Sequence, residues 1–128
     1  MLTLPPSVRI FIAAEPIDGR KGFNGLVSLV SGVLSHDPLS GHLFVFLNRR
    51  ADILRALFWD RTGYCLLSKR LERGRFQLPW EAPASTSHFE IEATDLMLLL
   101  EGIDLRGAMR RTRWTPVSVA MKKSASPI

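Results

Sequence analysis

The chain is poor in cysteine and has no long hydrophobic run. Its 128 residues include one cysteine, Cys65, so an internal disulfide is impossible and zinc patterns built on paired cysteines are excluded. The longest apolar runs, at 43–47 and 96–100, are far shorter than the roughly 18 residues that cross a bilayer. The first six residues lack the basic and apolar segments of a signal peptide. We therefore expect a cytoplasmic protein without membrane partners.

Residues that commonly carry catalysis or bind metals are also scarce. Cys65 is expected to be a small core residue, because a nucleophilic thiol needs a histidine close by. His36, His42 and His88 are scattered and lack metal-ligand spacing. No carboxylate pattern marks the pair of divalent ions that cuts DNA in many nucleases. We predict a protein that is not an enzyme and that holds no cofactor or metal.

The length and composition are those of one globular domain. A chain of 128 residues buries roughly two thirds of its unfolded surface, which is enough for folding without crosslinks. Hydrophobic residues make up 46% and charged residues 23%, as in ordinary soluble proteins. We predict a single compact α+β domain over residues 1–116. Residues 117–128 have no hydrophobic pattern and are expected to form a mobile basic tail.

Hydrophobic periodicity predicts a small, mainly antiparallel β-sheet with one longer and one shorter α-helix. The expected strands cover 7–13, 43–47, 53–59, 64–71 and 88–92, with a short edge segment at 76–80. Three consecutive strands, from 43 to 71, should form an antiparallel meander whose continuously apolar first member lies at the centre of the sheet. The longer helix is expected near 23–34. The shorter helix is expected to be capped by Thr94 and ended by Gly102.

Charge is distributed in blocks of opposite sign. Residues 49–75 contain eight lysines and arginines against three acids, whereas 76–104 contain six acids and no lysine or arginine. From residue 105 onward there are six basic residues and no acid. A basic block attracts the phosphates of nucleic acids. Alternatively, the acidic block folds against a basic block and leaves only weak surface ion pairs.

Eight basic residues are the candidate phosphate contacts. One predicted turn of the meander carries two arginines, and the end of its last strand, which carries four more basic residues, is expected to lie close to that turn. A glycine-flanked basic pair also precedes the first helix, where free backbone N–H groups favour anions, although the spacing is not that of a P-loop. The set is Arg20, Lys21, Arg49, Arg50, Lys69, Arg70, Arg73 and Arg75.

Three aromatic residues lie beside this basic block and offer a second way to hold nucleic acid. Trp59, Phe76 and Trp80 could stack on unpaired bases, but such residues usually fill the interior, so core packing is the expected role. No helix-turn-helix or zinc-finger motif is present. Contacts to phosphate position a protein without reading sequence, so we expect DNA binding of low specificity.

A series of short motifs spread over most of the chain resembles one protein family. The motifs are residues 20–23, 37–46, 48–50, Asp52, 59–60, Gly63, 69–72, 74–76 and 99–104. Together they resemble the accessory protein, often called TnpB, that is encoded beside the transposase in insertion sequence 66 elements. Gly19, Leu47 and Leu105 depart from the pattern of that family. The resemblance implies a non-catalytic protein that acts alongside a larger DDE-type transposase.

Two functions of different classes are compatible with these features. The first is an accessory protein of transposition that binds DNA through a basic face. The second is an adaptor that docks on the transposase through the acidic block and the apolar helix near 96–103, without contacting DNA. Convergence of the positive residues on one face favours the first function, whereas their dispersion among acids favours the second.

Overall fold

The structure is a computed structural model that describes residues 7–77 and 86–102. These residues form five strands and two helices, which confirms the predicted α+β class. The predicted domain boundary at 116, the basic residues from 105 onward, the predicted tail 117–128 and Trp80 lie outside the described residues. The elements are β1 (Ile10–Ala13), α1 (Phe23–Gly32), β2 (Leu43–Leu47), β3 (Ile53–Trp59), β4 (Tyr64–Arg70), β5 (His88–Ile91) and α2 (Ala93–Glu101).

All five strands belong to one sheet with the order β4-β3-β2-β1-β5. The predicted meander is confirmed, because β3 pairs antiparallel with both β2 and β4. Strand β1 pairs parallel with β2, and β5 pairs antiparallel with β1. A parallel pair needs a crossover connection, and α1 lies in the connection between β1 and β2. The central place of β2 agrees with its continuously apolar sequence, since all five of its residues are buried.

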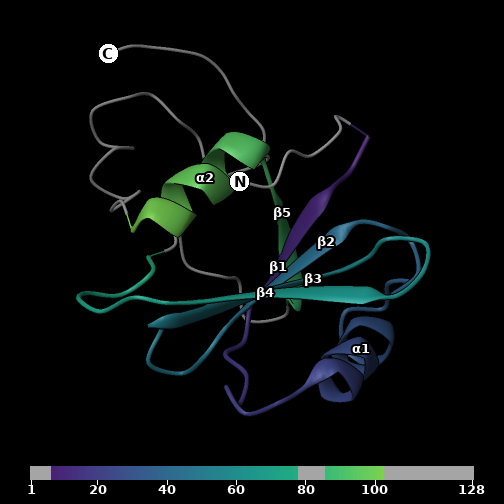
Figure 1. Ribbon diagram of the computed structural model, residues 1–128, viewed down its shortest axis with the longest axis horizontal. Helices are drawn as coiled ribbons and strands as arrows, with labels where there is room; N and C mark the ends of the chain where they lie inside the picture. The colour runs from purple at the N-terminus through teal and green to yellow at the C-terminus, as the bar shows by residue number, and fades with distance from the viewer. Residues whose placement is uncertain (1–6, 78–85, 103–128) are drawn as a thin grey trace.

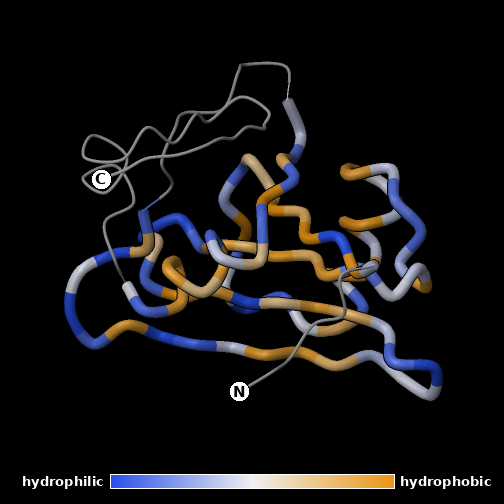
Figure 2. Tube along the Cα trace, turned by 90° about the horizontal axis from the view of Figure 1, so that it is seen from above, coloured by the Kyte–Doolittle hydropathy of each residue, from blue (hydrophilic) through white to orange (hydrophobic). Residues whose placement is uncertain are grey.

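The two helices cover opposite faces of the sheet (Figure 1). On one face, Leu26 and Val30 of α1 pack with Phe44 of β2 and other sheet residues. On the other face, Leu96 and Leu99 of α2 belong to a second buried cluster with neighbouring strands. Apolar positions therefore follow the strands, and hydrophilic positions gather at the turns (Figure 2). Neither described helix is long and apolar enough to span a bilayer.

Local hydrogen bonding moves several element boundaries away from their predicted places. The prediction that Thr94 caps the second helix is wrong: α2 begins at Ala93, and the Asp95 carboxylate accepts a hydrogen bond from the Glu92 N–H at 3.2 Å in a capping box. Gly102 ends the helix as predicted, with a left-handed φ of 82° that favours glycine. The first strand begins only at Ile10. Phe76 adds no edge strand and is buried in the core.

Candidate nucleic-acid interface

A tight turn between β2 and β3 projects two of the candidate arginines into solvent. The Asn48 side-chain oxygen accepts hydrogen bonds from the backbone N–H groups of Asp52 and Ile53, at 3.0 and 2.9 Å. Its amide nitrogen donates to the Asp52 carboxylate at 2.8 Å. This side chain therefore takes the place of backbone partners in the turn. Arg49 and Arg50 lie between these anchors and are exposed.

The segment after β4 returns to the same turn. The Leu71 N–H donates to the Asp52 carbonyl at 2.8 Å, and the Phe76 N–H donates to the Ala51 carbonyl at 2.7 Å. The loop between these two bonds carries Arg73 and Arg75, which are both exposed. These two arginines thus lie at the same end of the sheet as the β2–β3 turn, as the sequence predicts.

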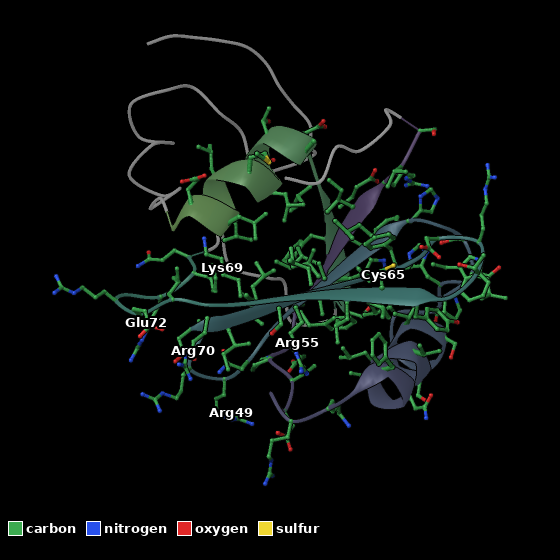
Figure 3. The ribbon with its side chains drawn as sticks, in the orientation of Figure 1. Arg49, Arg55, Cys65, Lys69, Arg70 and Glu72 are labelled. Atoms are coloured by element: carbon green, nitrogen blue, oxygen red, sulfur yellow. The ribbon has the colours of Figure 1, made fainter. Side chains whose placement is uncertain are left out.

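Strand alternation separates two neighbouring candidates onto opposite faces. Arg70 pairs with Ile53 and Lys69 pairs with Leu54, so their side chains leave β4 in opposite directions. Arg70 lies on the side of α1, and Lys69 on the side of α2 (Figure 3). The Lys69 Nζ donates a hydrogen bond of 2.6 Å to the Leu100 carbonyl near the end of α2. Lys69 is therefore engaged with a helix terminus, away from Arg70.

The turn before α1 brings the remaining two candidates to this end of the sheet. Ile17 forms a parallel bridge with Asn48, and its N–H donates to the Leu47 carbonyl at 2.9 Å. Arg20 and Lys21 follow a few residues later and are exposed to solvent. The α1 helix that starts at Phe23 has no side-chain cap and no acid in its first turn, and of the charges just before it, Arg20 and Lys21 outnumber Asp18.

Arg55 joins this group although its sequence position did not single it out. It lies in the middle of β3, and its guanidinium Nη1 donates a hydrogen bond to the Lys21 carbonyl. Its Nε is buried and has no partner among the described residues. Figure 3 shows Arg49, Arg55 and Arg70 on the same side of the sheet. The available signal was a single arginine in the otherwise apolar sequence of 53–59.

We call this region the basic end of the sheet. It comprises Arg20, Lys21, Arg49, Arg50, Arg55, Arg70, Arg73 and Arg75. Three acids lie within it. Arg20 pairs with Asp18 at 3.2 Å and Arg70 pairs with Glu72 at 3.6 Å, both on the surface. The hydrogen bond from Asn48, helped by the charges of Arg50 and Arg70, lowers the pKa of Asp52. Eight basic residues against three acids leave the region with a positive net charge, and exposed pairs of this kind are weak and screened by salt.

The acidic segment is engaged elsewhere in the described residues. Glu90 accepts two hydrogen bonds from the Arg9 guanidinium, at 3.0 and 2.7 Å, and this contact lowers the pKa of Glu90. Glu92 and Asp95 form the capping box of α2. Within 7–77 and 86–102, no ion pair joins the acidic segment to the basic end. The acidic block contacts the basic block through the Lys69–Leu100 hydrogen bond, but neutralisation of the basic end by ion pairs with acids of this segment is not seen in this part of the chain.

The aromatic candidates lie away from the basic end or inside the core. Trp59 packs against Tyr64 with ring centroids 5.0 Å apart, next to the β3–β4 turn, which is at the opposite end of the meander. Phe76 is only 3% exposed and cannot stack on a base. The expected core role of Phe76 is therefore confirmed, whereas Trp80 lies outside the described residues.

The lone cysteine has the features of a structural residue. Cys65 is partly exposed rather than fully buried as expected, and its thiol donates a hydrogen bond to the Asp60 carboxylate at 3.4 Å. Partial desolvation and the neighbouring carboxylate raise the pKa of the thiol, which disfavours the nucleophilic thiolate. Among the described residues, no group of three or more potential metal ligands is found.

The chain is similar to one family and to two curated relatives over most of its length. A family model described as IS66 Orf2 like protein matches residues 8–110. Uncharacterized protein y4jC of Sinorhizobium fredii is 38% identical over 113 residues, which cover 88% of this chain and 94% of the relative. Uncharacterized protein y4hO of the same organism is 40% identical over 119 residues, which cover 93% and 99%. No solved structure matches.

Proposed function

Because the chain belongs to the IS66 Orf2-like family, whose members are accessory proteins of transposition, we propose that it assists this process by binding DNA without catalysing a reaction. Phosphates of the DNA backbone contact the basic end of the sheet. The observation that carries the proposal is the meeting of basic side chains from three separate segments, at 20–21, 49–55 and 70–75. The protein acts in the cytoplasm, on the DNA of its own element.

The geometry of the basic end suits a phosphate backbone. Arg49 and Arg70 extend from the same side of the sheet (Figure 3), and Arg55 ties the Lys21 backbone to β3. Anchored elements thus carry long, exposed side chains, which reach phosphates from a fixed base. None of these residues lies on a helix arranged to enter a groove, so binding of low sequence specificity is expected.

Salt-dependent binding tests the proposal directly. The full chain is titrated onto a labelled duplex of the transposon end and onto a shuffled duplex, at several salt concentrations, with fluorescence anisotropy as the readout. Removing one phosphate contact makes the slope of log K against log salt shallower by about 0.9. A variant with Arg49, Arg50, Arg70 and Arg73 reversed in charge should lose binding to both duplexes.

A matched pair of single substitutions controls for net charge. Arg49→Gln and Arg61→Gln each remove one positive charge from a hairpin turn, but the two turns lie at opposite ends of β3. Arg49→Gln should reduce the salt slope by about 1, and Arg61→Gln should leave it unchanged. Equal effects of both substitutions, or no binding of the unmodified chain at low salt, would contradict binding through the basic end.

One observation favours a second function, docking on the transposase of the same element. Met97 and Leu98 of α2 are 40% and 39% exposed, and Leu67 of β4 is 42% exposed. A contiguous exposed apolar patch is typical of a protein interface, and the adjacent Met97 and Leu98 are candidates for part of one. If the adaptor function is correct, Met97→Gln with Leu98→Gln should abolish co-elution with the purified transposase in size-exclusion chromatography. The Arg49→Gln variant should then co-elute normally.

A further inference from the structure

The fold brings together two histidines that are 52 residues apart in the sequence. His36 follows α1, and His88 opens β5. Their Nε2 atoms lie 3.1 Å apart, and both rings pack against Phe11, with centroid distances of 4.2 and 5.6 Å. No sequence pattern indicates this pair, because neither residue belongs to a metal-ligand spacing. The contact is formed wholly by the tertiary structure.

We propose that His36 and His88 form a binding site for a borderline divalent cation such as Zn²⁺, held by both Nε2 atoms with solvent as the remaining ligands. Zinc–nitrogen bonds of about 2.0 Å from two nitrogens 3.1 Å apart meet at about 100°, near the tetrahedral angle that zinc prefers. The ring centroids are 4.8 Å apart, closer than in two rings that meet head-on. The rings are therefore bent toward one another, as shared coordination requires.

Each histidine is held in place by further contacts. The Nδ1 atom of His88 lies 2.7 Å from the Ser87 hydroxyl, a second contact that orients the ring and can accept the Nδ1 proton when Nε2 binds an ion. The backbone N–H of His36 donates to the Val30 carbonyl at 3.0 Å, and the His36 ring packs on Phe11 and Phe44. The two rings therefore need little further ordering when an ion binds.

The surrounding charges permit a cation. Glu90 and Arg9 neutralise one another in an ion pair of 2.7 Å, and the Asp37 carboxylate accepts the Leu39 N–H within its own loop. The Nδ1 of His42 accepts the Arg9 N–H at 3.0 Å, so this third histidine is turned to another partner. Partial burial, with the adjoining His36, lowers the pKa of His88, and this direction favours the neutral form of the ring that coordinates metals.

The composition of the chain makes the test clean. It contains three histidines and one cysteine, so few other soft ligands can compete. The full chain, freed of any histidine tag, is titrated with ZnCl₂ at pH 7.5 by isothermal calorimetry. We expect one ion per chain, with affinity at least tenfold weaker in His36→Gln and His88→Gln. The matched controls His42→Gln and Cys65→Ser should bind zinc like the unmodified chain.

A second measurement needs no variant and guards against misfolding. Long-range ¹H–¹⁵N spectra of the unmodified chain should show that the Nε2 resonances of His36 and His88 move on addition of zinc, whereas those of His42 do not. Acidification below about pH 6 should release the ion, because coordination requires neutral rings. Zinc binding that survives both substitutions, or no change in either Nε2 resonance, would overturn the proposal and leave the pair as a simple hydrogen bond. These outcomes are independent of DNA binding.

Discussion

Replacing Asn48 with alanine should open the β2–β3 turn and destabilise the whole sheet. The Asn48 side chain makes three hydrogen bonds, two accepted from the backbone of Asp52 and Ile53 and one donated to the Asp52 carboxylate. All three are partly buried. Each such bond contributes about 1 kcal/mol net. Water can bind some of the groups that lose their partner in this turn. We therefore expect Asn48→Ala to lower the free energy of unfolding by about 2–3 kcal/mol.

Urea unfolding, followed by tryptophan fluorescence and circular dichroism, measures this loss. The control is Ser40→Ala, which removes a single hydrogen bond of 3.2 Å from the His42 N–H to the Ser40 hydroxyl and should cost under about 1 kcal/mol. If Asn48→Ala unfolds within about 0.5 kcal/mol of the unmodified chain, the turn does not depend on this side chain and the reasoning is refuted.

Asn48→Asp separates the accepted bonds from the donated bond. The aspartate oxygen still accepts from the two backbone N–H groups, but it places a second carboxylate against Asp52. Like charges raise the pKa of one member of such a pair in the folded state. When folding raises the pKa of a carboxyl group, the free energy of unfolding decreases as the pH rises through that raised pKa. The stability deficit of Asn48→Asp should therefore be largest at neutral pH and should shrink on acidification.

Three further substitutions test other parts of the fold. Burial raises the pKa of Asp95 above its ordinary value of 3.8, so stability falls as the pH rises through that raised pKa. Asp95→Asn, which still accepts the Glu92 N–H, should gain stability relative to the unmodified chain as the pH increases in urea titrations. Gly102→Ala should lower the free energy of unfolding by about 1 kcal/mol, because φ of Gly102 is 82° and alanine is strained there. Thermal unfolding measures this loss, and an unchanged Tm would contradict the expected backbone strain. Leu26→Ala, at a fully buried position of α1, should lower the free energy of unfolding by about 2–5 kcal/mol. A loss under about 1 kcal/mol in urea unfolding would contradict tight packing of α1 on the sheet.

Much of the local structure was predictable because its causes are local. Alternation and continuous apolar runs marked the strands of the meander and the central β2, and Gly102 marked the end of α2. The placement of Arg49 and Arg50 in one hairpin turn, with Arg73 and Arg75 close by, followed from counting along antiparallel strands. Whether these residues contact DNA stays a prediction.

Other features could not be predicted from the sequence because the residues that form them are far apart along the chain. Pairing of β1 with β5, the contact between Arg55 and the Lys21 carbonyl, and the His36–His88 pair each join distant segments. Lys69 and Arg70 are neighbours in the sequence, yet the pleat of β4 sends their side chains to opposite faces. The cap of α2 was misplaced for a local reason, because threonine and acidic residues are both favoured at helix starts and the acids form the capping box here.

The sequence by itself determined the approximate position of the helices and of the five strands, the alternation of charge in blocks and the family to which the chain belongs. Hydrophobic periodicity and turn residues act over a few positions, so they can be recognised in the sequence alone. Only the tertiary structure decided that Arg55 and the pair at 20–21 join the basic end. It also decided that Arg9 pairs with Glu90 and that His36 faces His88. The physical reason is that packing of the two helices on opposite faces of one sheet sets those distances, and no short stretch of sequence encodes that packing.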